Sequence, residues 1–148
     1  MANAAALYTP EMLELATSLA AWPLDPAMPF QGRARSPACG STLMVSLSLD
    51  CAGRIAALGL RAQACAVGQA SAALFAAAAP GRTRSELAAT SEGLDAWLRG
   101  EGPLPGWPGL AGIAAAQAYP ARHGAILLAW QAALDALPDS PPGGLPST

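Results

Sequence analysis

The three cysteines, Cys39, Cys51 and Cys65, are the residues with the greatest capacity for chemistry in this chain. The first residues lack both a positively charged start and a long apolar run, so they do not suggest a secretory signal. An odd number of cysteines without such a signal argues against a disulfide framework. We therefore expect a cytoplasmic protein whose thiols are buried filler, metal ligands or reactive groups.

Cys65 has a chemical argument of its own. It precedes an alanine-rich stretch, Cys65–Ala79, whose composition favours a helix that ends at Pro80-Gly81. The unpaired N–H groups and the positive end of the dipole at a helix N-terminus stabilise a thiolate and lower its pKa. A thiolate is the form that accepts sulfur from a persulfide, so Cys65 is a candidate persulfide acceptor.

The other reactive side chains carry weaker signals. Cys51 lies in Asp50-Cys51-Ala52-Gly53, which predicts a hairpin turn, and we interpret it as incidental. His123, the single histidine, is interpreted as a surface or capping residue, with metal ligation as a minority alternative. The sequence shows no Ser/His/Asp set, no phosphate-cradling loop and no paired carboxylates, so a standalone enzyme has no support.

Length and composition limit the architecture. The chain has 148 residues, 53% hydrophobic and 12% charged, which predicts one domain with a sizeable core over residues 1–137. The Pro-, Gly- and Ser-rich tail, residues 138–148, predicts disorder. A net charge of −2 argues against nucleic acid as a partner, and no apolar run is long enough to predict a membrane span.

The N-terminal half predicts one helix and a small sheet. Thr9-Pro10-Glu11 is typical of a helix start, and the helix should end before Pro23. Thr42–Leu49 alternates between apolar and other residues, which predicts a half-buried strand. Arg54–Arg61 predicts its return partner, with a bulge at Ala56-Ala57, and the preceding loop, Leu24–Pro37, leaves room for one short edge strand.

The C-terminal half predicts helices and one loop. Thr83 and Glu86 have the spacing of a capping box, which predicts a short helix, and Ser91–Leu98 predicts a further short amphipathic piece. After the Gly100–Pro108 loop, helical structure is expected over Leu110–Gln117 and, most strongly, Arg122–Leu137, with Trp130 in the core and Trp97 and Trp107 packed under the loop. The fold class is α+β: a small antiparallel three-stranded sheet with helices on one face.

Four segments along the chain carry a recognisable order of motifs. They are Leu7-Tyr8; Pro37-Ala38-Cys39-Gly40-Ser41; Ala64–Ala72; and Tyr119-Pro120-Ala121-Arg122 with Leu128-Ala129-Trp130. In this order they resemble the U-type iron–sulfur cluster assembly scaffold family, which comprises IscU, SufU and the N-terminal domain of NifU. The Leu-Ala-Trp ending and the extra segment Gly100–Gln117 favour the SufU-like branch. The resemblance implies the fold of that family and cysteine desulfurases and other iron–sulfur assembly proteins as partners.

The resemblance also implies a ligand set, and the chain departs from it. Family members hold metal with three cysteines and an aspartate or a nearby histidine. The first two cysteine positions fall on Cys39 and Cys65. The aspartate position is Ser41 and the third cysteine position is Ala125, so two of the four expected ligands are lost.

Three routes would complete a site for an iron–sulfur cluster or zinc, each of which needs four ligands. His123 would reach the site only from a frayed helix start, since a regular helix turns it about 160° away from Ala125. Alternatively, two subunits of a homodimer would each offer Cys39 and Cys65, or a partner protein would supply the missing ligands. The remaining alternative is that no cofactor is bound.

The sequence thus leaves two functional hypotheses. The first is an iron–sulfur cluster assembly scaffold homologue that handles iron, a cluster, zinc or persulfide transiently at Cys39 and Cys65, as a scaffold or sulfur carrier and not as a standalone enzyme. The alternative is an interaction or regulatory module that binds no metal and docks on a cysteine desulfurase or another assembly factor.

Overall fold

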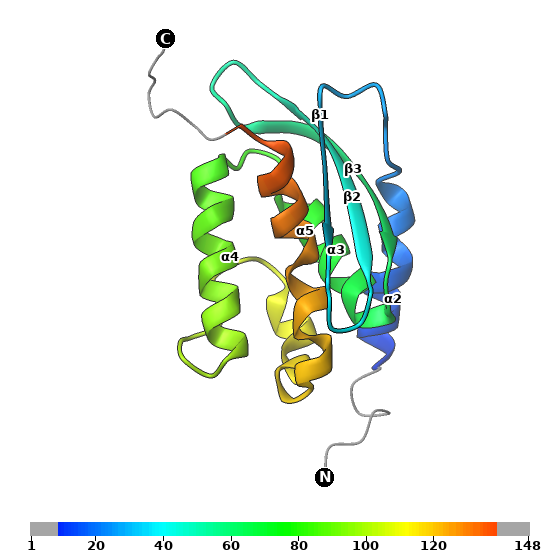
Figure 1. Cartoon of the computed structure of the whole chain (residues 1–148), viewed down its shortest axis with the longest axis vertical. Coiled ribbons are helices and arrows are strands. Elements are labelled where there is room, and N and C mark those ends of the chain that lie inside the picture. The colour runs from blue at the N-terminus through cyan, green and yellow to red at the C-terminus, as the bar shows by residue number, and fades with distance from the viewer. Residues whose placement is uncertain (1–8, 139–148) are drawn as a thin grey trace.

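Three antiparallel strands form one sheet in the order β1-β2-β3 in the computed structural model, which describes residues 9–138 (Figure 1). Tyr8 and the residues before it, and the tail from residue 139 onward, lie outside this range. The architecture is the expected α+β class, including the short edge strand. In chain order the elements are α2 (Pro10–Ser18), η1 (Leu19–Ala21), β1 (Phe30–Arg35), β2 (Thr42–Leu49), β3 (Ile55–Gln63), α3 (Ala66–Ala78), α4 (Arg84–Leu98), η2 (Leu110–Ala118), η3 (Pro120–Arg122) and α5 (His123–Ala136).

The alternation predicted for β2 sets the two faces of the sheet. Leu43, Val45 and Leu47 are buried, while Met44 faces outward, as the period of two requires. The predicted bulge is present, because the β2–β3 register slips between Ser48 and Leu49, whose partners Ala57 and Ile55 leave Ala56 unpaired.

The β2–β3 hairpin closes through the side chain of Asp50. Its Oδ1 accepts hydrogen bonds from the backbone N–H of Ala52 and of Arg54, and Gly53 takes a positive φ of 81°. The bond from Arg54 is the main reason why the pKa of Asp50 is lowered. The predicted turn therefore has the expected chemistry, and Cys51 lies exposed within it.

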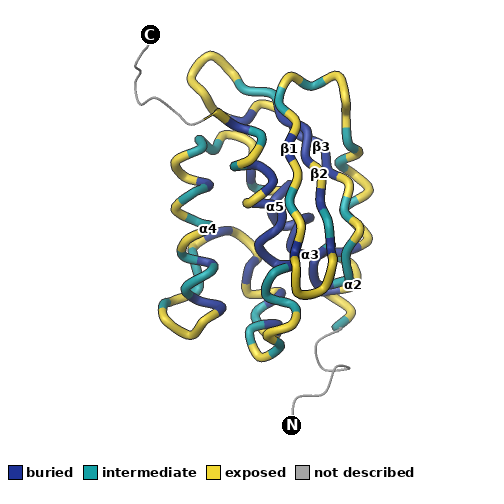
Figure 2. The backbone as a smooth tube through the Cα atoms, in the orientation of Figure 1, coloured by how far each residue is buried: buried dark blue, intermediate teal, exposed yellow. Residues whose placement is uncertain are grey.

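Helices α3 and α5 cover the inner face of the sheet, and α4 packs on α5 on the side away from the sheet (Figure 1). Close contact between α5 and β1 depends on Gly32, because a Cβ at this position would lie 2.6 Å from the backbone nitrogen of Ala136. Figure 2 shows α3 and α5 as mainly buried, whereas the hairpin loops are exposed. No helix among residues 9–138 is long and apolar enough to cross a membrane.

An aromatic cluster fills the centre of the helical layer. Phe75 of α3 stacks on Trp107 with ring centroids 5.7 Å apart, and both rings meet Trp130 of α5 edge-on. Trp107 also donates a hydrogen bond from Nε1 to the carbonyl oxygen of Leu74, at 2.8 Å. Trp130 is buried in the core as expected, and Trp97 and Trp107 are also buried.

One expectation about the helices was wrong. The residues from Thr83 to Leu98 form one helix, α4, and not two short pieces. The capping box of Thr83 and Glu86 is present. The helix continues because no Pro interrupts it and because Leu87 and Leu94, two turns apart, are both fully buried on one face.

Candidate thiol site

Cys39 lies at the tip of the loop between β1 and β2. Two backbone hydrogen bonds close this loop, from Ser36 N–H to the Ser41 carbonyl and from Gly40 N–H to the Ser36 carbonyl, both at 2.8 Å. Gly40 takes a positive φ of 73°, which a glycine adopts without steric cost. The tight loop leaves the Cys39 side chain exposed.

Cys65 lies at the other side of the same end of the sheet. It follows β3 and is the N-cap residue of α3, as predicted, with extended backbone angles (φ −66°, ψ 171°). Its side chain makes no capping hydrogen bond and is half-buried. The Cys65 thiol is therefore available at the N-terminal end of a 13-residue helix.

Both thiols line one open pocket of about 270 Å³. Strand β3 contributes Gln63, and the N-cap of α5 contributes Arg122. Since no carboxylate lines this pocket, its only formal charge in the thiol form is the positive charge of Arg122. The lining residues are Cys39, Gly40, Ser41, Gln63, Ala64, Cys65 and Arg122.

Neighbouring hydroxyl groups favour the thiolate of Cys39. The side chain of Ser36 is the largest cause of the lowered pKa of Cys39, followed by the side chain and then the backbone of Ser41. Slight desolvation opposes this effect, and the charge of Arg122 adds to it. Cys39 Sγ lies 3.0 Å from Ser41 Oγ. Ser36 Oγ is buried without a hydrogen-bond partner, so its hydroxyl is free to turn toward the thiolate when it forms.

The other two candidate ligand positions do not line the pocket. His123 begins α5, and its Nε2 lies 2.8 Å from the carbonyl oxygen of Gln117, which makes that nitrogen the donor. Ala125 is 1% exposed and lies in the contact between α3 and α5, where a Cβ on Gly68 would approach its Cβ to 3.2 Å. Among the family ligand positions, the pocket thus contains those of Cys39, Ser41 and Cys65.

A metal held by one copy of this chain does not fit the pocket. Within residues 9–138 there is no group of three or more His, Cys, Asp or Glu side chains that could hold a metal ion. A closed zinc or cluster site needs four ligands, and the pocket offers two thiols. Arg122 beside them further disfavours a cation.

Sequence reasoning missed Ser36 as a partner of Cys39. The signal was present in Ser36-Pro37-Ala38-Cys39-Gly40. Pro after the serine and Gly after the cysteine predict a turn that brings the side chains of Ser36 and Cys39 together. Arg122 belongs to the fourth segment of the sequence resemblance. The structure places Arg122 in the thiol pocket.

Solved structures of other proteins share the architecture of this chain. The N-terminal part of a nitrogen-fixing NifU-like protein from Brucella abortus is 28% identical, with a TM-score of 0.80 over 88% of this chain and 91% of that chain. A candidate iron–sulfur cluster assembly scaffold protein for the SUF system from Fervidobacterium islandicum is 16% identical, with a TM-score of 0.77 over 88% and 96% of the two chains. No protein-family model matches the chain, and no curated protein matches it.

These similarities define the fold of the protein. The three-stranded antiparallel sheet with helices on one face is the small α+β fold that this chain shares with the NifU-like and SUF-system proteins. The ordered sequence motifs and the similarity to the NifU-like protein agree, and both point to the U-type scaffold family.

Proposed function

We propose that this protein takes part in iron–sulfur cluster assembly as a SufU-like scaffold homologue that handles sulfur, and transiently metal, at Cys39 and Cys65. One observation carries the proposal: both thiols line one open pocket, and the neighbouring hydroxyls lower the pKa of the exposed Cys39. The similarity to two solved structures, a NifU-like protein and a candidate scaffold protein of the SUF system, supports the scaffold role.

Sulfur transfer requires the fewest groups. The Cys39 thiolate attacks the terminal sulfur of a persulfide on a cysteine desulfurase, forming a new S–S bond while the S–S bond of the donor breaks. The donor cysteine leaves as a thiolate, and the transferred sulfur keeps its oxidation state, so the step needs no oxidant or reductant. Cys39 is the first acceptor because it is exposed, and Cys65 at the helix N-cap remains the second candidate.

Metal is then cargo and not a resident cofactor. Two thiols from one chain leave a tetrahedral zinc or iron site open, so the remaining ligands come from a second copy or from a partner protein. This form of the proposal requires that the pocket stay accessible, which its position at the end of the sheet allows.

A second candidate function is supported by the two substituted positions. Ser41 and Ala125 replace ligands of the family, and a module that only docks on a desulfurase or another assembly factor would need neither. Such a module would also not need the thiols of Cys39 and Cys65. The two candidates therefore differ in the consequence of removing these thiols.

The deciding experiment incubates the protein with a cysteine desulfurase and cysteine and measures persulfide on the protein by mass spectrometry. We expect the wild type to gain one sulfur atom, Cys39→Ser to lose this gain and Cys51→Ser to retain it. If Cys39→Ser and Cys65→Ser together accept sulfur or support cluster assembly as well as the wild type, the thiol function is wrong and the docking module stands.

A matching measurement addresses the metal. Zinc, iron and acid-labile sulfide are determined in protein purified anaerobically without chelators. Metal near stoichiometry that disappears in Cys39→Ser or Cys65→Ser would show transient loading at the pocket. A folded, metal-free protein that still accepts sulfur would restrict the function to sulfur transfer.

A further inference from the structure

The outer face of the sheet carries a row of two arginines around a methionine. Arg33 of β1, Met44 of β2 and Arg61 of β3 are direct cross-strand partners, so their side chains point to the same face. Arg35 lies two residues after Arg33 and therefore extends the row on this face. We call Arg33, Arg35, Met44 and Arg61 the arginine face.

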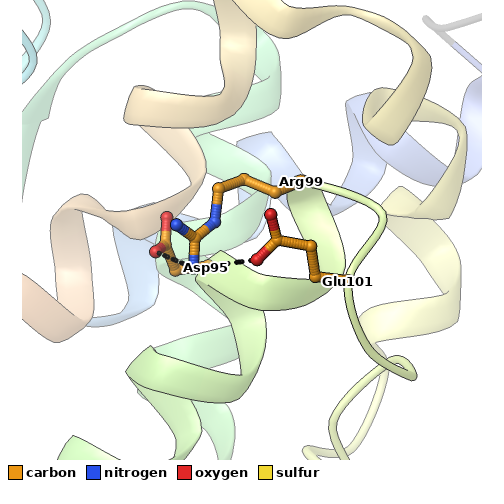
Figure 3. A network of polar contacts seen from close by, with 3 residues as sticks. All are labelled: Asp95, Arg99 and Glu101. Atoms are coloured by element: carbon orange, nitrogen blue, oxygen red, sulfur yellow. Dashed lines mark ion pairs between the residues drawn. The ribbon is translucent and has the colours of Figure 1, made fainter.

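None of the three arginines of this face makes an ion pair with another residue in the described part of the chain. Arg99 at the end of α4 shows the contrast, because it pairs with Asp95 at 3.2 Å and with Glu101 at 3.5 Å (Figure 3). A chain with a net charge of −2 has carboxylates to spare, yet its arginine face leaves three cations unpaired.

Two carboxylates of segments that contact the sheet are engaged with backbone groups. Asp135 of α5 accepts a hydrogen bond from the backbone N–H of Arg33, at 3.1 Å, at the β1 edge. Asp25 caps the backbone N–H of Ala27, and the segment that carries it covers Ser46 further along the sheet. The positive charge of the face is therefore directed to solvent.

The arginine face is also apolar at its centre and hollowed at its edge. Met44 is 39% exposed and is one of two exposed large hydrophobic side chains among residues 9–138. A hollow of about 520 Å³ lies between Arg33, Arg35 and Met44, and a second one of about 230 Å³ lies between Arg33, Met44 and Asp135. Both hollows are lined by residues of β1 and β2.

We propose that the arginine face is a docking surface for an acidic segment of a partner protein that also presents an apolar side chain to Met44. Charge complementarity specifies the acidic character, since three unpaired guanidinium groups favour carboxylates through charge-assisted bonds. The exposed methionine and the short hollows favour a protein segment over nucleic acid, which a net negative chain would repel overall.

The location gives this surface a consequence for the thiol pocket. Arg35 ends β1, and the loop that begins at Ser36 carries Cys39. A partner bound to the arginine face therefore lies beside the Cys39 loop. This inference does not depend on the proposed function, because it requires only the sheet face and its charges.

Fluorescence anisotropy with synthetic peptides tests the surface. The probe is a short labelled peptide with two central leucines flanked by glutamates; the comparison probes have serines for the leucines, or lysines for the glutamates. We expect Arg33→Glu with Arg61→Glu to weaken binding of the acidic peptide about tenfold or more. Arg54→Glu with Arg99→Glu changes the net charge equally at remote exposed positions and should bind as the wild type.

Two further measurements keep the result unambiguous. Arg33→Gln with Arg61→Gln avoids a new carboxylate beside Asp135 and should weaken binding in the same direction, with circular dichroism confirming the fold. Met44→Ser should weaken binding of the leucine peptide but not of the serine peptide.

Equal losses in the sheet and control variants, or no binding by the wild type, would refute the docking surface. Tighter binding of a single-stranded RNA, lost in the sheet variants, would overturn the choice of a protein partner.

Discussion

The two ends of α3 differ in almost every physical respect. Its N-cap, Cys65, borders an open pocket with two thiols and one arginine. Further along the same helix, Phe75 is fully buried and packs against Trp107 and Trp130. The Cys65 end is accessible to molecules from solvent, whereas the Phe75 end must fit the shape of the side chains packed around it.

This difference separates the two positions at which the chain departs from the ligand set that the sequence resemblance implies. Ser41, where the resemblance implies an aspartate, lines the pocket, so a charge there can change without the loss of a core contact. The third cysteine position, Ala125, lies in the contact between the two central helices, where a small apolar side chain fits beside Gly68. Chemistry at the pocket and stability of the core are therefore expected to respond to different substitutions.

The largest expected effect on stability comes from the buried end of α3. Phe75→Ala removes a ring that contacts both tryptophans, and we expect a loss of about 3–5 kcal/mol in the free energy of unfolding. Urea unfolding followed by tryptophan fluorescence measures it. Cys39→Ser is the control and should change the same quantity by less than about 0.5 kcal/mol. Similar losses in both variants would contradict the distinction between the buried core around Phe75 and the exposed thiol pocket.

A second experiment measures thiol reactivity at the pocket, where we expect little contribution to stability. We expect Cys39 to be the fastest of the three cysteines to react with iodoacetamide at neutral pH, because it is exposed and its pKa is lowered. Cys39→Ser should remove this fast phase, whereas Cys51→Ser, which removes an exposed thiol in a hairpin turn, should retain it. Mass spectrometry of the labelled peptides identifies the site. A fast phase that belongs to Cys51 would contradict the assignment.

Much of the fold could be predicted because its signals are local. The alternation of β2, the glycine turn at Gly53 and the capping box of Thr83 each depend on residues close together in the chain. The packing of Trp107 against Phe75 and Trp130 could not be predicted, since it depends on contacts across more than one element.

The candidate site was predictable only in part. The family motifs selected Cys39 and Cys65, and the structure brings both to one pocket. Composition could not show that Ser36 lies close enough to influence the Cys39 thiol, because that depends on how the loop closes. It also could not separate Ser41, which lines the pocket, from Ala125, which does not.

Restoring the lost ligands tests that separation. Ser41→Asp places a carboxylate in the pocket, so we expect it to raise zinc affinity about tenfold or more, measured by competition with a chromogenic chelator. Ala125→Cys alone should change zinc affinity less, and it should cost about 1–3 kcal/mol in the free energy of unfolding because the added sulfur enters a packed contact. A larger gain from Ala125→Cys than from Ser41→Asp would show that α5 shifts toward the pocket when metal binds.

The smallest expected effect comes from the removal of one hydroxyl group, that of Ser36. Ser36→Ala removes the largest cause of the lowered pKa of Cys39, so that pKa should rise and the thiolate fraction at neutral pH should fall. The alkylation rate of Cys39 follows the thiolate fraction, so its midpoint should move to higher pH while its plateau at high pH stays unchanged. Because Ser36 Oγ is buried without a hydrogen-bond partner, its removal leaves no other group unsatisfied, and the fold should be retained. A lower plateau with an unmoved midpoint would mean that Ser36 only positions the loop, and the lowered pKa of Cys39 would then be caused by Ser41 and Arg122.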